Sequence, residues 1–502
     1  MAMTNYIDEK RITAVATAVS WERIYLYIDV KLQYKTPKER NGELCFYAVD
    51  AMYYAQAKFK VVSRTDDTFR LKLNITNSGE NACVPSGEYR LIVCRDDCQM
   101  ADCETDTAIV GSMSEFSRNF LYSDQTRSYT VTFYVEEDAD TLPFRFYILA
   151  AGQTNMVFPT KTHLRDKLRI IAAIQSTWGS RKNILRTMYS FFYKLYATKR
   201  KNTILFMSEQ NKVIASNLKA VSDRMRERGM DKEYRLLYSA RSAAAEPQSL
   251  KSWVELMQKM AQSSIIFIDD HAPLLDWLRL SPDTKLIQLW HAGAGFKSSG
   301  YSRWGHMGCP GATSCHRQYD FGIAGSRNIA PFFSEVWGIN DEQVLPTGMP
   351  RMDEFLREDY QREKTKELYD KFPVVKGKKV MLFAPTYRGR GKRFAHYPYE
   401  LIDFKGLYEA CGSEYVVLFK MHPWVSSKVP IPKQFQDKFL DVGKYSKIND
   451  LFYITDLLVT DYSSNIFEYS LMRRPMMFFA YDKIQYSFSR GFHRDYEESA
   501  PG

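Results

Sequence analysis

The strongest constraint on the fold of this chain is a change of pattern at residue 203. From there, compact apolar runs of strand length alternate with segments long enough for a helix, and the runs read TILFMS, SIIFIDD, KLIQLWH, FGIAGS, QVLPTG, KVMLFAP, YVVLFKMHP and DLLVTDYSS. Such alternation indicates parallel sheets covered by helices. The runs form two sets, one on each side of TGMPRMDEFLREDY. The sequence therefore predicts an α/β protein with two Rossmann-like domains, over residues 203–350 and 351–502, with a cleft between them.

The part before this change has a different period. Residues 1–158 contain short runs in which apolar and polar residues alternate, such as RIYLYIDVKLQY, FRLKLNIT, EYRLIVC and SYTVTFYV, separated by Gly, Asn, Asp and Pro. A period of two is typical of antiparallel strands with one buried face, in a sandwich or a barrel. We expect residues 1–158 to form an all-β, sandwich-like accessory domain. A chain of 502 residues is long enough for about three domains.

Residues 159–202 carry the whole net charge of the chain. Between Lys161 and Lys201 there are eleven Lys or Arg and one acid, which equals the total of +10. Leu185, Met188, Phe192 and Leu195 recur there at helical spacing. Basic, aromatic and amphipathic character together is typical of helices on an anionic membrane surface. The expected membrane-binding residues are Arg181, Lys182, Arg186, Lys199, Arg200 and Lys201.

Two alternatives to the membrane-surface interpretation differ in strength. The segment could be a solvated linker whose apolar stripe packs on a neighbouring domain, and this alternative stays open. Nucleic acid is not an expected partner, because no recognised nucleic-acid-binding module accompanies the charge.

Several classes of protein are excluded by what the sequence lacks. The charged start MAMTNYIDEKRIT has no apolar core, and no run approaches the roughly 18 apolar residues of a membrane span. We therefore expect a protein that is neither secreted nor transmembrane. The eight cysteines are scattered, which fits a reducing compartment. Cys94, Cys98 and Cys103 are close in sequence but have no second Cys pair or His nearby. We expect no metal and no cofactor.

Polar side chains follow the predicted strands at the point where each strand ends. In parallel sheets, ligands bind beyond the carboxyl ends of the strands. The candidate site residues at these ends are His291, Ser326, Thr386, Arg388, Lys420, His422, Asp461, Ser463 and Ser464. Hydroxyl, guanidinium and imidazole groups suit phosphate oxygens, and a helix N-terminus after Ser463 and Ser464 would attract an anion. The alternative for the two serines is simple N-capping.

Seven motifs give the chain a family resemblance. They read QLWHAGAGFKSSGYSRWG, YDFGIAGS, TGMPRMDEF, LFAPTYRG, FKMHP, DLLVTDYSSNIFEYSLMRRPMMFFAYD and RGFHRDYEE. Together they resemble the bacterial CDP-glycerol glycerophosphotransferases, which include the teichoic-acid poly(glycerol phosphate) and poly(ribitol phosphate) polymerases and primases. The resemblance covers about residues 203–502.

The resemblance implies a GT-B fold with an acceptor-side domain and a CDP-alditol-binding domain. It also implies a peripheral enzyme on the cytoplasmic face of the bacterial cell membrane, held there by basic amphipathic helices. Such an enzyme transfers glycerol phosphate or ribitol phosphate from a CDP-alditol to a lipid-linked acceptor or growing polymer and releases CMP. A homo-oligomer is left open.

Two features depart from the family pattern. Some members have His-Gly-Thr where this chain has His291-Ala292-Gly293, so this motif does not assign the chain to a subgroup of the family. Relatives usually continue beyond the equivalent of Gly502, so we expect the last domain to be shortened. No feature of the sequence separates a glycerol donor from a ribitol donor, or a primase from a polymerase.

Phosphoryl transfer assigns roles to the candidate residues. An acceptor hydroxyl needs a base, and the diphosphate needs positive groups around it. His291 is the expected base, as the resemblance also implies, because histidine ordinarily titrates near pH 6.5. His422 is the second expected catalytic residue, and the remaining candidates are expected to bind substrate. Asp461 would either bind a donor hydroxyl or orient His422.

Two rival functions are compatible with parts of the sequence. A GT-B hexosyltransferase is disfavoured, because many of those enzymes have a Glu-Gly-Phe-Gly loop and a further Glu where this chain has Asp461-Tyr462-Ser463-Ser464. A non-catalytic membrane adaptor is disfavoured by the presence of His291 and the phosphate-type residues. We expect His271 to be structural, and His316 to lie on the acceptor side or in a surface loop.

Overall fold

The computed structural model describes residues 12–35, 42–50, 55–78, 81–95, 98–122, 127–135, 141–150, 181–198, 200–242, 248–305, 309–311, 314–389 and 394–500. The chain forms two compact units. The first unit comprises residues 1–290, 299–323 and 327–346. The second comprises residues 291–298, 324–326 and 347–502, so that two short segments from the middle of the chain belong to it.

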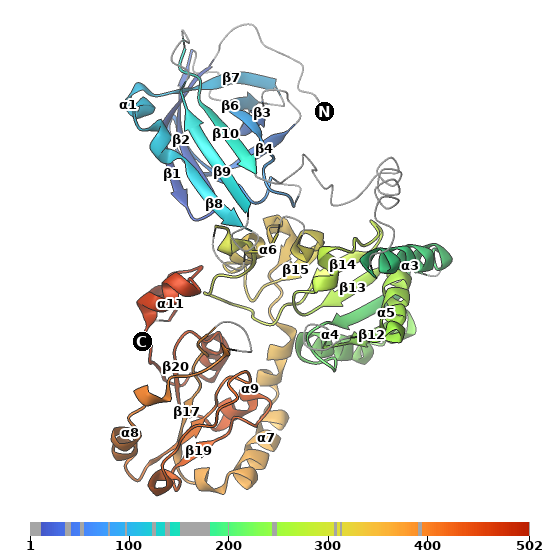
Figure 1. The fold of residues 1–502 in the computed structure, drawn as a ribbon, viewed down its shortest axis with the longest axis vertical. Helices are drawn as coiled ribbons and strands as arrows, with labels where there is room; N and C mark the ends of the chain where they lie inside the picture. The colour runs from blue at the N-terminus through green and yellow to red at the C-terminus, as the bar shows by residue number, and fades with distance from the viewer. Residues whose placement is uncertain are drawn as a thin grey trace. The chain divides into compact units, whose positions relative to one another are not determined.

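The N-terminal part of the first unit is a closed barrel (Figure 1). Its strands are β1 (Ile12–Glu22), β2 (Tyr25–Tyr34), β3 (Leu44–Asp50), β4 (Gln56–Thr65), β5 (Thr68–Asn74), β6 (Gly87–Arg95) and β7 (Cys98–Thr105). They follow the order β3-β4-β5-β2-β1-β7-β6, and β6 pairs back with β3. Beyond β6 the sheet continues through β10 (Arg145–Ala150), β9 (Arg127–Tyr134) and β8 (Arg118–Tyr122). The short helix α1 (Thr107–Val110) follows β7.

The barrel corrects the sandwich-like expectation for this domain. Irregularities interrupt the register between Ala16 and Ala18 in β1 and between Val61 and Ser63 in β4. Bulges of this kind increase local twist and bend a strand, which allows a sheet to curl and close. The alternation of apolar and polar residues is the same in a sandwich and in a barrel, so the sequence pattern could not separate them.

The barrel and the first α/β sheet belong to one unit because side chains tie them together. Arg317 is 2% exposed and donates to the carbonyl oxygens of Thr76 in the barrel and Gly338 in the α/β part. Arg23 binds the buried Glu335 carboxylate through two hydrogen bonds of 3.1 and 2.9 Å. Leaving one partner of such a buried pair unmatched is costly, so these contacts favour a fixed junction.

The first parallel sheet confirms the predicted alternation of strands and helices. Its order is β12-β11-β13-β14-β15-β16, and every pair is parallel. The strands are β11 (Thr203–Ser208), β12 (Arg235–Ala240), β13 (Ile265–Ile268), β14 (Lys285–Gln288), β15 (Phe321–Ile323) and β16 (Val344–Leu345). The helices are α4 (Ser216–Glu227), α5 (Leu250–Gln262) and α6 (Ala330–Trp337). All six residues of β11 are buried, which explains its continuous apolar run.

The second sheet has a topological switch point. Its order is β19-β18-β17-β20-β21, again with every pair parallel. The strands are β17 (Lys379–Phe383), β18 (Tyr415–Phe419), β19 (Phe439–Asp441), β20 (Leu457–Thr460) and β21 (Met476–Phe478). The chain adds β18 and β19 on one side of β17 and then returns to add β20 and β21 on the other. Crevices for ligands form at such a reversal, beyond the carboxyl ends of the strands.

Helices accompany this second sheet along the chain. They are α7 (Glu358–Lys371), α8 (Phe404–Cys411), α9 (Ile448–Leu451), α10 (Asn465–Tyr469), α11 (Lys483–Ser489) and α12 (Tyr496–Ser499). The buried side chains around β17, β18 and β20 form a continuous apolar core that includes Leu382, Leu418 and Leu458.

Helix α3 (Arg181–Leu195) packs beside α5 in the first unit (Figure 1). Leu185 and Tyr189 are buried, at 4% and 5% exposure, so the packing alternative holds for this face. The opposite face exposes Ile184, Phe191 and Leu195 at 56%, 62% and 59%.

Two of the six expected membrane-binding residues form hydrogen bonds within the protein instead. Arg200 is 5% exposed and donates to the Ser263 carbonyl oxygen, which corrects its assignment to a membrane surface. Arg186 donates to the Trp277 carbonyl oxygen at 2.7 and 3.0 Å and is likewise held by the protein. Lys182 and Lys201 are exposed. Residues 159–180, Lys199 and the side chain of Arg181 lie outside the described residues. Within the described ranges, no helix is both long and apolar enough to cross a membrane.

Candidate functional site

The segment that follows β14 is seated in the second unit. The Ser298 N–H donates to the Gly491 carbonyl oxygen at 3.1 Å, and the His493 N–H donates to the Phe296 carbonyl oxygen at 2.6 Å. Phe296 is 1% exposed in a cluster with Tyr462, Tyr486 and Tyr496. Burial of an aromatic side chain of this size contributes on the order of 2 kcal/mol. This seat fixes the position of the intervening Lys297.

Close backbone contact explains the glycines in this segment. The Gly325 N–H donates to the Gly293 carbonyl oxygen at 2.8 Å. A Cβ atom on Gly325 would lie 2.6 Å from that oxygen, and one on Gly293 would lie 2.3 Å from the Met349 side chain. Only glycine fits at such an approach. The contact places the exposed Ser326 directly after the paired glycines.

Cationic side chains gather beyond the carboxyl ends of β17 and β18. Burial lowers the pKa of Lys297 to about 8, with Asp461 opposing the shift and Arg490 and Arg388 adding to it. Burial also lowers the pKa of Lys420, whose ammonium group donates to the Gly443 carbonyl oxygen at 2.9 Å. Lys420 is one of the site residues predicted from the sequence, whereas Lys297 and Arg490, which come from segments far apart in the chain, are not among them.

His422 lies among these cations and is neutral near pH 7. Burial lowers its pKa to about 4, and Lys297, Lys420 and Arg490 add to the shift. Its Nδ1 accepts the Trp424 N–H at 3.1 Å, so the proton of the neutral ring lies on Nε2. The ring of Tyr387 lies 4.7 Å away, centre to centre. His422 can therefore donate one hydrogen bond to a phosphate oxygen without carrying charge.

The guanidinium group of Arg388 is paired with two carboxylates, so its donors are not free to bind a phosphate. Its Nε and Nη2 donate to Asp482 at 2.6 and 2.8 Å, and its Nη1 lies 2.9 Å from Asp461. Asp461 is fully buried and also accepts the Thr386 N–H at 2.7 Å. The structure thus gives Asp461 a scaffolding position, orienting Thr386 and Arg388. Substrate binding by Arg388 and Asp461 stays a prediction, and it would require an exchange of partners.

The hydroxyl-bearing candidates lie at the same strand ends. Thr386 is 5% exposed, and its hydroxyl has no hydrogen-bond partner among the described residues. Ser464 precedes α10 without capping it through its side chain. The Ser463 hydroxyl accepts the Asn465 N–H at 3.3 Å. The Ser463 side chain therefore makes only a weak capping contact with α10, and the Ser464 side chain makes none. The Thr386 hydroxyl is available to a ligand.

His291 has an acidic neighbour that sequence reasoning missed. The His291 carbonyl oxygen accepts a hydrogen bond from Arg351 Nη2 at 2.8 Å, and Arg351 also forms an ion pair with Glu468. Burial raises the pKa of Glu468, while Arg351, Asn449 and His291 oppose the shift. The His291 side chain is exposed. Arg351 thus holds the backbone of this exposed histidine.

Two surface hollows in the second unit lie away from these residues. Their volumes are about 520 and 740 Å³, and Tyr369, Tyr453 and Arg474 line both. The smaller one includes Lys379, the first residue of β17, which places it at the amino ends of the strands. Neither contains a predicted site residue, and the strand topology favours the opposite edge of the sheet.

Comparison with known proteins adds independent information. The family described as CDP-Glycerol:Poly(glycerophosphate) glycerophosphotransferase matches residues 187–502. Teichoic acid ribitol-phosphate polymerase TarK of Staphylococcus aureus is 35% identical over 376 residues, which are 74% of this chain and 72% of TarK. The teichoic acid poly(ribitol-phosphate) polymerase of Bacillus spizizenii is 33% identical over 451 residues, 86% of this chain and 70% of that protein. The solved structure of the wall teichoic acid polymerase TagF matches with a TM-score of 0.54 at 25% identity, covering 68% of this chain and 86% of that one.

The electrostatics of His422 can be checked by NMR. We expect its ring signal, assigned by its loss in His422→Gln, to show no titration between about pH 5 and 8, because the pKa is lowered to about 4. Lys297→Met should raise that pKa toward the ordinary value of about 6.5, since one repelling charge is removed.

Lys201→Met provides the matched control, because Lys201 is exposed in the other unit. A wild-type His422 signal that titrates near pH 6.5 would contradict this description of the cluster. A His422 pKa that is unchanged in Lys297→Met would also contradict it.

Proposed function

The chain belongs to the CDP-glycerol:poly(glycerophosphate) glycerophosphotransferase family, and we propose that its second unit binds the CDP-alditol donor beyond the carboxyl ends of β17, β18 and β20. Members of this family are CDP-alditol phosphotransferases of teichoic acid synthesis. This chain is an enzyme of that class, transferring glycerol phosphate or ribitol phosphate. We assign the two parallel sheets to the two halves of a GT-B fold.

The main support for the proposed donor site is a cluster of cationic side chains that repel one another. Arg388 is neutralised by Asp461 and Asp482. Burial lowers the pKa of His422, and Lys297, Lys420 and Arg490 lower it further. A diphosphate brings negative charge to this position and relieves the repulsion among these groups. The Thr386 hydroxyl and the Nε2–H of His422 supply directional donors. Ser463 and Ser464 complete the proposed phosphate-binding edge.

The proposed reaction is an in-line displacement at the β-phosphorus of the CDP-alditol. The acceptor hydroxyl oxygen forms a bond to this phosphorus, and the bond from the phosphorus to the oxygen bridging it to CMP breaks. CMP leaves with the electron pair of that bond, and the hydroxyl proton passes to the ring of His291. The cation cluster stabilises the charge that develops on CMP. No step requires a metal ion.

We propose CDP-ribitol as the preferred donor. Both relatives described above are named ribitol-phosphate polymerases, and each is matched over at least 70% of its length. The acceptor is then a lipid-linked polyol phosphate or the growing polymer. Ser326 lies in the exposed turn after the glycine contact and is assigned to substrate binding.

We further propose that α3 holds the enzyme against the cytoplasmic face of the cell membrane. Its exposed stripe of Ile184, Phe191 and Leu195 lies on one face of the helix, with Lys182 and Lys194 also exposed. Apolar side chains flanked by lysines are suited to an anionic lipid surface. This stripe replaces Leu185 as the inserting surface, because Leu185 is buried against the protein.

A product assay tests the function. The chain is incubated with CDP-ribitol, CDP-glycerol or a UDP-hexose, each with a lipid-linked polyol-phosphate acceptor, and released nucleotides are measured. We expect CMP release to be fastest with CDP-ribitol. UDP release would support the hexosyltransferase alternative. Absence of release with every donor would support the adaptor alternative.

Variants separate the base from the donor site. We expect His291→Ala to lower turnover by about 100-fold or more and to leave donor affinity nearly unchanged, since a base acts on the acceptor. Lys297→Met should weaken donor binding by about tenfold or more, because a charge-assisted contact is lost. Calorimetry with the donor and steady-state kinetics measure the two effects.

His396→Ala is the control for the loss of a histidine, because this side chain is exposed outside the cluster. Near-normal turnover in His291→Ala would remove His291 from the mechanism. Unchanged donor affinity in Lys297→Met would place the diphosphate elsewhere.

Vesicle flotation tests the membrane surface. Changing Ile184, Phe191 and Leu195 to Ser should reduce binding to phosphatidylglycerol vesicles by about tenfold or more, because three apolar side chains no longer insert. The matched control changes Leu250, Leu356 and Leu471 to Ser, which are exposed at 69%, 82% and 51% on other elements. Equal flotation of both triple variants and the wild type would contradict the assignment of this face.

A further inference from the structure

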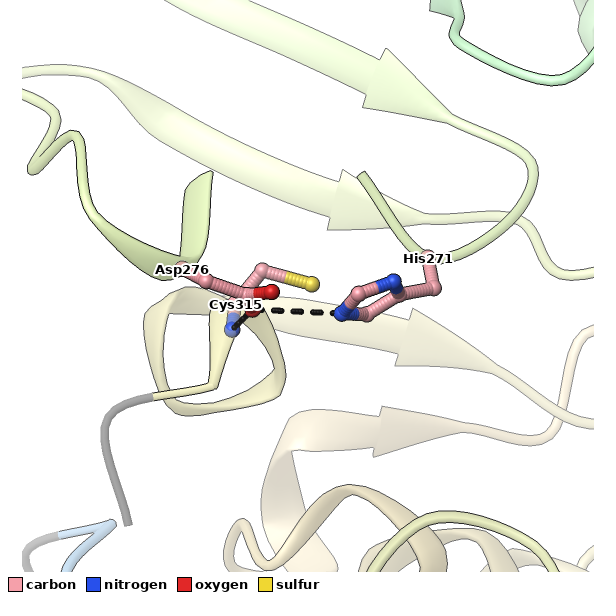
Figure 2. A group of neighbouring side chains, drawn as sticks. All are labelled: His271, Asp276 and Cys315. Atoms are coloured by element: carbon pink, nitrogen blue, oxygen red, sulfur yellow. Dashed lines mark hydrogen bonds and ion pairs between the residues drawn. The ribbon is translucent and has the colours of Figure 1, made fainter. Parts of the chain in front are cut away.

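Three side chains with different ligand atoms converge in the first unit (Figure 2). His271 follows β13, Asp276 ends the 3₁₀ helix η4 (Pro273–Asp276), and Cys315 begins the 3₁₀ helix η6 (Cys315–Gln318). Their ligand atoms all lie within 4.8 Å of one another. The His271 Nε2 lies 3.1 Å from the Asp276 Oδ1, and this oxygen also accepts the Cys315 N–H at 2.7 Å. Figure 2 shows the sulfur directed toward the imidazole.

A second histidine borders the group. The rings of His271 and His316 are 5.4 Å apart, centre to centre, and the His316 Nδ1 lies 2.9 Å from the Tyr319 hydroxyl. Burial opposes ionisation of the Cys315 thiol, but hydrogen bonds from His271 and His316 lower its pKa to about 6. The Cys315 sulfur therefore lies within the same group as two imidazole rings, and a cysteine binds a metal ion after it has lost its proton.

The chemistry of this group suits a zinc ion better than a nucleophile. Cys315 is fully buried, so no substrate reaches its sulfur, while the side chains of His271 and Asp276 are 34% and 38% exposed. Those two partly exposed side chains give an ion access from solvent. A divalent cation bound by a thiolate and a carboxylate is neutralised by their two negative charges, and its binding releases the protons of the cysteine and histidine ligands. Nitrogen, oxygen and sulfur ligands together favour Zn²⁺.

We propose that His271 Nε2, the Asp276 carboxylate and Cys315 Sγ bind one Zn²⁺ ion, with a water molecule or His316 Nε2 as the fourth ligand. The ion displaces the proton with which the His271 Nε2 binds the Asp276 carboxylate, and the Cys315 thiol loses its proton to solvent. It links η4 to η6, two segments that are joined in sequence only through a connection of 38 residues. The site is structural and lies outside the donor-binding residues.

The position of the site gives the ion a defined role. The His316 ring lies 6.4 Å from Trp290, centre to centre, and Trp290 has a left-handed backbone with φ of 49°. A bulky residue in this conformation is strained unless its surroundings hold it. By fixing η6, the ion supports the ring packed against Trp290, at the point where the chain leaves β14 for His291.

Metal analysis of the full chain, purified without a tag after expression with added zinc, tests the proposal. We expect about one zinc per chain in the wild type and less than about a tenth of that in Cys315→Ser and His271→Asn. Cys45→Ser is the matched control, because Cys45 is a partly exposed cysteine of the same unit outside the group, and it should retain the wild-type content.

A second measurement on the unaltered chain covers the case in which a variant fails to fold. A chelator should lower the Tm of the wild type, and added Zn²⁺ should restore it. Replacement with Co²⁺ should give a thiolate-to-cobalt absorption band, which depends on the sulfur being a ligand. Wild-type protein that contains no stoichiometric metal, and whose Tm and spectrum do not respond to Zn²⁺ or Co²⁺, would overturn the proposal. All of these readouts are independent of transferase activity.

Discussion

The burial of Phe296 among Tyr462, Tyr486 and Tyr496 is the interaction on which the donor site depends. It holds a segment from the middle of the chain within the second unit, where residues 296–298 pair with residues 491–493. Lys297 follows Phe296 directly, so the burial of Phe296 and the backbone pairing of this segment fix the position of Lys297. Without the burial of Phe296, repulsion by the neighbouring cations would disfavour this position of the Lys297 ammonium group.

The site balances attraction and repulsion in two layers. Arg388 is enclosed by Asp461 and Asp482, and Tyr462 donates to Asp482 at 2.9 Å, so this layer is satisfied within the protein. Lys297, Lys420 and Arg490 form a second layer of positive charge around the buried His422 and add to the lowering of its pKa. Electrostatic strain of this kind is typical of sites whose ligand supplies the missing charge. The satisfied layer provides a rigid support for the strained one.

Much of this architecture could be predicted from the sequence, for physical reasons. Parallel strands buried on both faces require continuous apolar runs, which fixed the strands that precede Thr386, Lys420 and Asp461. The remaining features depend on contacts between distant residues. The Arg388 pairing with Asp482, the seat of Lys297 and the burial of Arg200 leave no local pattern. The convergence of His271 with Cys315 likewise depends on tertiary structure, and the closure of the barrel depends on bulges that the alternation does not reveal.

A structure of the chain with a bound CDP-alditol tests the position of the proposed donor site. We expect the diphosphate beyond the carboxyl ends of β17 and β18, with its oxygens about 3 Å from the Lys297 ammonium, the Thr386 hydroxyl and the His422 Nε2. A diphosphate bound at another edge of the sheet, with no contact to Lys297, would contradict it.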